Sequence, residues 1–202
     1  MKERPLLFSA PMVRALIAGT KSQTRRVVKA PGWDPASPEY GGLTGIKQHA
    51  DERIGLQAYF WHARSALAHG VRCPYGQPGD RLWVRETWRR YGDGIAYRAD
   101  YGDASFADEV HAPWKPSIHM PRCLSRITLE ITGVRVERLK DISADDAYDE
   151  GAADWAAETQ RNGNKWPNIV RAYQGLWESI NGPGSWDANP WVWVLSFRRL
   201  PS

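Results

Sequence analysis

The sequence predicts an α+β fold, a small β-barrel of mixed or antiparallel strands with helices on its outside. Most segments with a regular pattern alternate apolar and polar residues as strands do, and only a few short helical patterns lie between them. No βαβ unit repeats, so crossover helices do not separate the strands. Short strands without such crossovers favour a compact barrel. A length of 202 residues suits one domain, and we expect residues 1–202 to form a single unit.

The chain opens with a short strand followed by a short helix. Residues 6–8 are apolar and β-prone, and Ser9 is a favourable residue before the first helical turn, where Pro11 is tolerated. Gly19 is typical of the position just after a helix end. The helix should therefore end there, and the chain should continue as an extended segment over residues 24–28.

The next fifty residues read as a loop, a helix and a group of turns. Residues 30–55 are rich in Pro, Gly and Asp, which predicts a loop. Residues 53–69 carry apolar side chains spaced for one helical face, namely Leu56, Phe60, Ala63 and Leu67. We therefore expect a helix there and turns over residues 70–80.

Strands dominate the middle of the chain. Residues 81–88 and 95–99 are β-prone, and residues 127–136 form a long alternating segment in which Gly133 predicts a bulge. The stretches between these strands should lack regular strands, because residues 101–112 are polar and residues 113–123 contain three prolines.

The C-terminal third predicts two helices and a last strand. Ser143, with Asp146 three residues later, resembles a capping box, so a helix should begin near residue 144. Apolar residues at helical spacing predict a second helix over residues 169–180. Residues 191–197 then alternate as a terminal strand.

Charge is distributed unevenly along the chain. Residues 1–30 hold seven Lys or Arg and one acidic residue, whereas residues 141–158 hold seven acidic residues and no basic one. A basic N-terminal face suggests a phosphate or polyanion partner. The alternative is a dipolar surface that only contacts solvent.

Several classes of protein do not fit the sequence. No apolar run reaches 18 residues and the N-terminal residues lack the long apolar region of a signal peptide, so we expect a cytoplasmic protein, in the host cell if a phage encodes it, with no membrane partner. Cys73 and Cys123 form no CxxC pair, and no histidines stand at metal spacing. There is also no Walker loop and no GxSxG elbow. We expect neither a metal nor another cofactor.

Three motifs together resemble the ASCH domain family. A short helix is followed by G-x-K-x-x-T-x-R, which places Gly19, Lys21, Thr24 and Arg26 in order. Pro-Gly-Asp at residues 78–80 precedes a strand, and a capped helix ends in A-x-x-E-G at residues 147–151. The wider sequence is similar to an ASCH branch common in phages and prophages.

This resemblance implies a PUA-like β-barrel, a fold associated with RNA. It covers most of the chain, and residues 30–75 and 89–123 would be insertions relative to a minimal ASCH domain. It therefore implies a nucleic-acid-binding or modified-nucleotide-binding protein, RNA-directed, with its ligand in a basic cleft.

The resemblance also implies a possible catalytic set. Some small ASCH proteins are amidohydrolases that remove the acetyl group of N4-acetylcytidine, and their lysine, threonine and glutamate fall on Lys21, Thr24 and Glu150. A threonine hydroxyl needs a base to become a nucleophile. A lysine amine can be that base if its pKa is lowered, which burial and the neighbouring Arg25 and Arg26 favour. Glu150 could orient the amine or move a proton, and an arginine could stabilise the oxyanion.

Other interpretations of the same residues remain open. Lys21 and Arg26 could bind phosphates while Thr24 donates a hydrogen bond. Glu150 could be an ordinary helix-end residue paired with Lys21 or an arginine. In a fully extended segment, Lys21 and Thr24 would face opposite sides, so they converge only if the chain turns between them.

Two further stretches contain candidate binding residues. Arg85 and Glu86 lie on opposite faces of the strand over residues 81–88, and a carboxylate on the inward face needs a partner, which is either a base edge or, preferably, an arginine. Trp88 could stack on a base or belong to the core. The second stretch, residues 113–123, is stiffened by prolines and could form one wall of the cleft, with Lys115, His119 and Arg122 as donors.

The sequence thus favours a binding protein for RNA or for a modified nucleoside or nucleotide. The alternative is an amidohydrolase acting on N4-acetylcytidine-type nucleosides. A ribonuclease, which also occurs in the family, and a structural or protein-interaction role in phage growth are weaker alternatives, because no particular residues here favour them.

Overall fold

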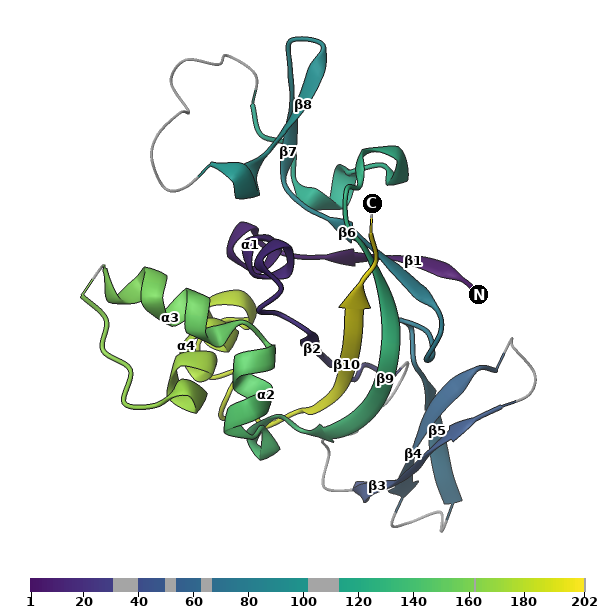
Figure 1. Cartoon of the computed structure of the whole chain (residues 1–202). Helices are drawn as coiled ribbons and strands as arrows, with labels where there is room; N and C mark the ends of the chain where they lie inside the picture. The colour runs from purple at the N-terminus through teal and green to yellow at the C-terminus, as the bar shows by residue number, and fades with distance from the viewer. Residues whose placement is uncertain (31–39, 50–53, 63–66, 102–112, 162, 202) are drawn as a thin grey trace.

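The computed structural model describes residues 1–30, 40–49, 54–62, 67–101, 113–161 and 163–201 (Figure 1). The strands in these ranges are β1 (Glu3–Leu7), β2 (Gln23–Val27), β3 (Tyr40–Gln48), β4 (Leu56–His62), β5 (Leu67–Arg72), β6 (Arg81–Arg85), β7 (Trp88–Tyr91), β8 (Gly94–Tyr97), β9 (Thr128–Arg138) and β10 (Trp191–Arg199). The α-helices are α1 (Ala10–Ala18), α2 (Ala144–Asp149), α3 (Ala152–Gln160) and α4 (Ile169–Asn181). Short 3-10 turns are η1 (Arg98–Asp100), η2 (Ser117–His119), η3 (Arg122–Leu124) and η4 (Leu139–Asp141). None of the described helices combines the length and apolar character needed to cross a membrane.

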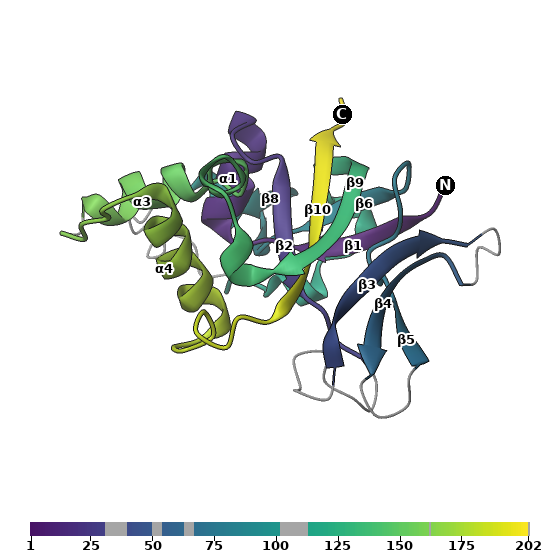
Figure 2. The same ribbon diagram turned by 90° about the horizontal axis from the view of Figure 1, so that it is seen from below.

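The main sheet has five strands in the order β1-β6-β9-β10-β2. β1 runs parallel to β6, and the other neighbours are antiparallel. Figure 2 shows the sheet from below, with β9 and β10 side by side at its centre. Mixed helices and strands confirm the predicted α+β class. In the described part of the chain, however, β1 and β2 do not pair with each other, so the sheet has two edges and no closed barrel is found.

A bulge interrupts β9 where the sequence predicted it. Ser196 of β10 pairs with Gly133, but the next residue, Phe197, pairs with Ile131, so one residue of β9 is extra. Figure 1 shows β9 bending along its length. A bulge increases local bending and twist, which helps this strand to curve around the core.

The predicted helix over residues 53–69 is wrong. Its described parts are β4 and β5, which with β3 form a separate three-stranded sheet. In β4 the buried positions are Leu56, Ala58 and Phe60, a period of two, whereas Trp61 is exposed. The segment forms strands although its apolar spacing also fits a helix, because aromatic and β-branched neighbours pack well on a pleated surface.

The predicted loop over residues 30–55 is also wrong in part, because β3 lies inside it; residues 31–39 and 50–53 are outside the described ranges. The strand predicted over residues 81–88 is divided into β6 and β7, which pairs with β8. Of the predicted polar loop over residues 101–112, all but the first residue lies outside the described part.

The remaining predicted elements are confirmed, except that residues 70–72 of the predicted turns belong to β5 and residues 98–99 of the predicted strand belong to η1. α1 lies between the first strand and Gly19, α2 begins after the cap Ser143, and α4 and β10 occupy the last third. The Ser143 side chain accepts a hydrogen bond from the backbone of Asp146, as a cap should. Residues 113–123 form no regular strand: they contain η2, the start of η3 and an isolated bridge from Lys115 to Trp88.

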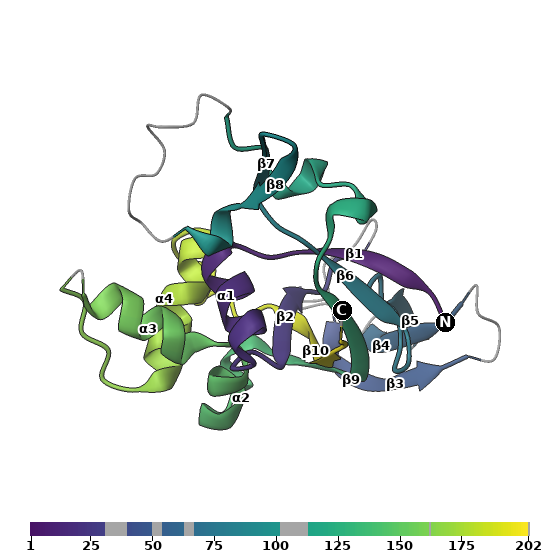
Figure 3. The same cartoon turned by 45° about the horizontal axis from the view of Figure 1, so that its top comes forward.

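One core joins the helices to both sheets. β10 lies between the helices and the β3-β4-β5 sheet, and Val192, Trp193, Val194 and Leu195 are all buried. Figure 3 shows α2, α3 and α4 on one side of the main sheet and β3, β4 and β5 on the other. This packing fixes α4 and the α2–α3 junction against β2, the edge strand that carries the G-x-K-x-x-T-x-R motif.

Candidate functional site

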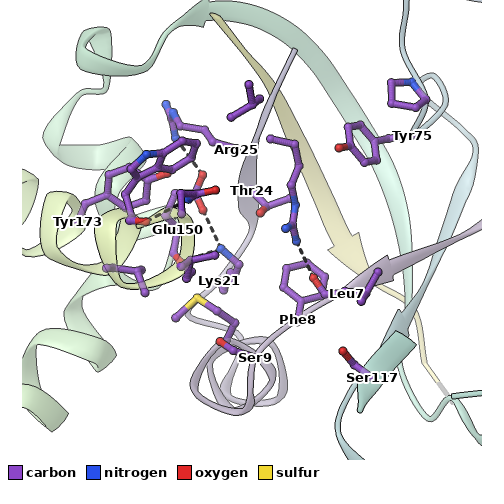
Figure 4. Close-up of a pocket in the computed structure, with 18 of the residues that line it drawn as sticks. Leu7, Phe8, Ser9, Lys21, Thr24, Arg25, Tyr75, Ser117, Glu150 and Tyr173 are labelled. Carbon is purple, nitrogen blue, oxygen red and sulfur yellow. Dashed lines mark hydrogen bonds and ion pairs between the residues drawn. The ribbon is translucent and has the colours of Figure 1, made fainter. Parts of the chain in front are cut away.

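A cavity of ≈ 650 Å³ lies between the two edges of the main sheet (Figure 4). Its lining includes Leu7 and Phe8 from the end of β1, Thr24 and Arg26 from β2, and Glu150 from the α2–α3 junction. Side chains of α1, α4 and the segment before β6 complete the wall. The opening in the sheet is therefore a pocket with polar groups on its inner wall.

Lys21 reaches this cavity because of how α1 ends. Gly19 adopts a left-handed conformation with φ 79°, and the next two backbone N–H groups bond back to the carbonyl of Ala15. This tight exit lets the backbone of Lys21 form an isolated bridge with Glu150. The chain therefore turns before β2 begins, as convergence of Lys21 with Thr24 requires.

Glu150 is placed by a sharp bend between two helices. Glu150 is the C-cap residue that follows α2, and Gly151 then takes φ 78° before α3 begins. A Cβ atom on Gly151 would lie 3.1 Å from the Cβ of Ala15 and 3.5 Å from that of Lys21. Only glycine suits both this conformation and this close contact with α1. The Glu-Gly pair thus brings the carboxylate beside the lysine.

Lys21 and Glu150 form a buried ion pair. Lys21 Nζ donates to Glu150 Oε2 at 2.8 Å and to the Glu150 carbonyl at 2.7 Å, and the side chains are 2% and 4% exposed. Burial lowers the pKa of the Lys21 amine; Glu150 offsets part of this effect, and Arg26 and Arg25 add to it. The amine thus donates two of its N–H groups to Glu150. Its third position is available to the cavity, as an N–H group in the charged form or as a lone pair in the neutral form.

Thr24 lies on the same cavity with its hydroxyl available. Thr24 is only 4% exposed, and it lines the pocket. β2 is an edge strand, so side chains from both of its faces reach the cavity beside it. No hydrogen bond of the Thr24 hydroxyl occurs within the described residues. This hydroxyl can therefore donate to a ligand or give its proton to a base.

Arg25, which the sequence analysis assigned to ligand binding, holds carboxylates instead. Its guanidinium is completely buried and contacts Glu150 Oε1 at 3.2 Å and Asp146 at 2.9 Å, as well as Glu137 and the side chain of Gln23. Lys21 and Arg25 thus hold the two oxygens of one carboxylate. Arg25 lines the cavity, but its Nε, Nη1 and Nη2 all donate to protein side chains, so it orients the site.

Arg26 and Lys29 are the cations that remain free of carboxylates on the cavity lining in the described part of the chain. Arg26 Nη2 donates to the Leu7 carbonyl at 2.6 Å, which ties β2 to β1 across the opening, and its guanidinium lies 5.4 Å from the Phe8 ring. Its Nε is buried without a partner among the described residues. Lys29 is exposed. These two residues give the cavity a positive side.

Aromatic residues that the sequence analysis did not select form much of the remaining wall. Tyr75, Tyr173 and Trp177 line the cavity, and Tyr173 lies under the Arg25 guanidinium at 5.9 Å. Burial raises the pKa of Tyr173, so its hydroxyl is neutral and can donate. Tyr75 comes shortly before the Pro-Gly-Asp motif, and this motif is the sequence signal that could have identified it. No motif in the sequence marks Tyr173 or Trp177 as cavity residues.

Arg85, Glu86 and Trp88 do not line the cavity. Glu86 is 1% exposed and forms two hydrogen bonds with Arg126, at 2.9 and 3.0 Å, which is the structural pairing that the sequence favoured. Burial raises the pKa of Glu86, and Arg126 counters this. Arg85 donates to backbone carbonyls near η2. Trp88 is buried with the Lys115 amine 5.0 Å from its ring, so it belongs to the core and not to a stacking surface.

The proline-rich stretch supplies one wall residue, but not the predicted ones. Ser117 of η2 lines the cavity, whereas Lys115, His119 and Arg122 do not. Lys115 and His119 are exposed, and Arg122 pairs with Glu3 at 3.0 Å. The structure thus brings together Lys21, Thr24, Arg25, Arg26 and Glu150 and leaves the other predicted residues outside the cavity.

Comparison of the chain with protein-family models, curated proteins and solved structures finds no match. Within the described ranges, no group of three or more His, Cys, Asp or Glu side chains is placed to hold a metal ion. The chemistry of the cavity is therefore argued from its own side chains.

Proposed function

We propose that the chain binds a modified nucleoside or nucleotide, as part of RNA, in the cavity between β1 and β2. The observation that carries this proposal is the convergence of Lys21, Thr24 and Glu150 on one cavity of ≈ 650 Å³, whose positive side is formed by Arg26 and Lys29. This volume is within the range of small-molecule sites, about 300–1,000 Å³. The neutral donors and aromatic rings would contact the base, and the free cations would contact phosphate.

The same convergence supports assigning the chain to the ASCH family, with a PUA-like barrel that is open at β1 and β2. Two of the three motifs that resemble that family meet in space, and the third holds the start of β1. Lys21 and Glu150 pair directly. Asp80 of the Pro-Gly-Asp motif accepts hydrogen bonds from Lys2 and Arg4, at the start of β1. Motif residues thus position both the cavity and the strand that borders it.

The proposed compartment is the cytoplasm, that of the host cell if a phage encodes the protein. Both cysteines of the chain, Cys73 and Cys123, are free thiols. Free thiols are typical of a reducing compartment, where RNA is also present.

We propose amide hydrolysis as a second candidate function, because the unpartnered Thr24 hydroxyl lies on the cavity that also holds a lysine of lowered pKa. In this reaction Thr24 Oγ1 attacks the acetyl carbon of N4-acetylcytidine, and its proton passes to the neutral Lys21 amine. The C–N bond then breaks, the released nitrogen takes that proton, and an acetyl ester remains on Thr24. Water hydrolyses the ester to acetate. In this reaction Arg26 would stabilise the oxyanion, which leaves Lys29 as the cation for a phosphate.

Titration of the protein with N4-acetylcytidine tests the first proposal, and the release of cytidine measured by chromatography tests the second. Thr24→Val keeps the side-chain shape and removes the hydroxyl. It should abolish turnover and retain binding within about tenfold, because one neutral hydrogen bond contributes about 0.5–1.5 kcal/mol. Thr44→Val, on β3 and away from the cavity, is the matched control and should change neither.

The two proposals fail separately. No saturable binding of N4-acetylcytidine or its 5′-monophosphate would refute the binding function. Binding without cytidine release, unchanged by Thr24→Val, would refute the hydrolase and leave the binding function in place.

A further inference from the structure

The outer face of β6 carries a row of cations around one tryptophan. Leu82 and Val84 point into the core, so Arg81, Trp83 and Arg85 lie on the other face. The Arg85 guanidinium is 5.2 Å from the centre of the Trp83 ring, and that of Arg122 is 5.9 Å from it. We call these four residues, Arg81, Trp83, Arg85 and Arg122, the arginine strip.

The arginine strip begins at the rim of the cavity. Arg85 pairs in register with Leu7, which lines the cavity. It also donates to the carbonyl of Ile118, the neighbour of the cavity residue Ser117. From there the strip continues along β6 to Trp83 and Arg81, whose partners on β1 are Pro5 and Glu3. A ligand that leaves the cavity between β1 and η2 therefore meets these cations in sequence.

The opposite side of the cavity has the opposite charge. Exposed carboxylates occupy η4, α2 and α3, namely Asp141, Asp145, Asp149 and Asp154. Figures 1 and 3 place α2 and α3 on one side of α1 and β2, and β6 on the other. A polyanion with one residue in the cavity is therefore repelled from the helices and attracted to β6.

We propose that the arginine strip binds the flanking nucleotides of a single-stranded RNA whose modified nucleotide occupies the cavity. This inference rests on the proposed function and extends it from a nucleoside to a position within an RNA strand. Guanidinium groups beside an indole are a combination that suits single-stranded nucleic acids: charges for the phosphates and a flat surface for a base.

The carboxylate beside the strip does not prevent this binding. Glu3 pairs with Arg122 at 3.0 Å, and the side chains are 38% and 43% exposed. Such an exposed pair contributes little, about 0–1 kcal/mol, so a phosphate can replace the carboxylate at small cost. Glu130, the cross-strand neighbour of Arg81, already pairs with Arg198, so the strip holds three guanidinium groups against the displaced Glu3 carboxylate and this paired one.

The test compares one probe with a strand and one without. The first is a fluorescein-labelled single-stranded RNA of ten nucleotides with one central N4-acetylcytidine, measured by anisotropy at several NaCl concentrations. The second is free N4-acetylcytidine, measured by calorimetry. Trp83→Ala should weaken RNA binding about tenfold or more, the effect of losing one stacking surface, and Trp83→Phe should retain most of the affinity. Arg122→Ala should weaken RNA binding and reduce the salt slope by about 0.7, the value for one phosphate contact in a single strand.

Neither variant should change the affinity for the free nucleoside, because Trp83 and Arg122 lie outside the cavity. Arg14→Ala is the matched control: Arg14 is also a partly exposed arginine paired with a glutamate, Glu158, at 2.9 Å, but it lies on α1 and outside the cavity. It should leave both affinities unchanged. RNA affinity that is equal in the wild type, Trp83→Ala and Arg122→Ala overturns the strip, whereas failure of the wild type to bind the free nucleoside overturns the proposed function.

Discussion

Lys21 Nζ and Glu150 Oε2 lie 2.8 Å apart, in a place where almost no part of either side chain reaches solvent. The two residues are 129 positions apart in the sequence, and each is fixed by a glycine with positive φ, Gly19 or Gly151. The pair therefore joins the end of α1 to the α2–α3 junction. It is both a structural link and the centre of the candidate site, and these two roles can be separated by mutation.

The first prediction concerns the stability of this pair. Lys21→Met leaves Glu150 buried with Arg25 as its remaining cation, and we expect the free energy of unfolding to fall by about 3–5 kcal/mol. Adding Glu150→Gln to Lys21→Met removes the uncompensated charge, so the double variant should lose less than the sum of the single variants. Urea unfolding followed by tryptophan fluorescence measures all three. Arg198→Met breaks an exposed pair and should cost at most about 1 kcal/mol. Strict additivity would show that Lys21 and Glu150 are not coupled.

The second prediction concerns the pH dependence of amide hydrolysis. In the proposed hydrolysis the neutral Lys21 amine acts as the base. Burial holds its pKa below the ordinary value of 10.5, so kcat/KM should rise with pH and reach its plateau below that value. Lys29→Ala removes an exposed amine at the rim and should leave the position of this rise unchanged. A rate that falls as the pH rises from neutrality would exclude Lys21 as the base.

A third prediction isolates the close approach at Gly151. Gly151→Ala puts a left-handed conformation on alanine and adds a Cβ atom 3.1 Å from Ala15, so we expect a loss of stability greater than that of Gly19→Ala. Gly19 has nearly the same φ, 79° against 78°, but a Cβ there would have no neighbour within 4 Å. Conformational strain alone costs about 1–2 kcal/mol, which Gly19→Ala should show. Equal losses in the two variants, measured by thermal unfolding, would mean that the α1 contact does not constrain the α2–α3 junction.

Arg26 should distinguish nucleotides from nucleosides. Its buried Nε has no partner among the described residues, and Lys21 and Arg25 are occupied by carboxylates. Arg26→Gln should therefore weaken binding of N4-acetylcytidine 5′-monophosphate by about tenfold, the effect of one charge-assisted bond, and change binding of the free nucleoside less. Calorimetry with both ligands measures the ratio. The same loss for both ligands would show that Arg26 does not contact the phosphate.

Acid should weaken the network around Arg25 through Asp146. Burial alone would raise the pKa of Asp146, but Arg135 and Arg25 outweigh it and hold the pKa below its ordinary value of 3.8. The carboxylate thus stabilises the folded state above pH 3.8, and this contribution is lost as the pH falls from 3.8 through the lower folded-state pKa. The difference in unfolding free energy between the wild type and Asp146→Asn should shrink over that interval. Asp145→Asn, at an exposed neighbouring position, should differ little from the wild type at any pH.

The elements that form the cavity were predictable because local signals agreed with the tertiary structure there. A proline in the first turn, a glycine end and a following extended segment define α1 and β2, and the capping residue Ser143 defines the start of α2. The error over residues 53–69 arose from a short apolar segment whose spacing fits both periods. What decided it was packing of Phe60 on Trp191, whose rings are 5.5 Å apart and which no local pattern connects.

The candidate site, like the fold, was predictable from the sequence only in part. The family resemblance implied a shared site for Lys21, Thr24 and Glu150, and glycines with positive φ place Lys21 and Glu150 there. Arg25 and Arg26 are neighbours with the same side chain, yet one is enclosed by carboxylates and the other faces the cavity. That difference depends on Glu137 and Asp146, which reach β2 only through the fold.

The cavity has walls from both ends of a single sheet, with β1 on one side and β2 on the other. Its width therefore depends on how strongly the whole sheet curls, and the β9 bulge beside Gly133 contributes to that curl at the centre. Removing the extra residue would flatten the sheet and spread its margins apart, so ligand affinity should respond to a deletion that no ligand atom touches. The hydrogen bond from Arg26 to the Leu7 carbonyl connects the two edge strands of the sheet. A ligand that strengthens this bond would therefore couple its own binding to the curvature at the distant bulge.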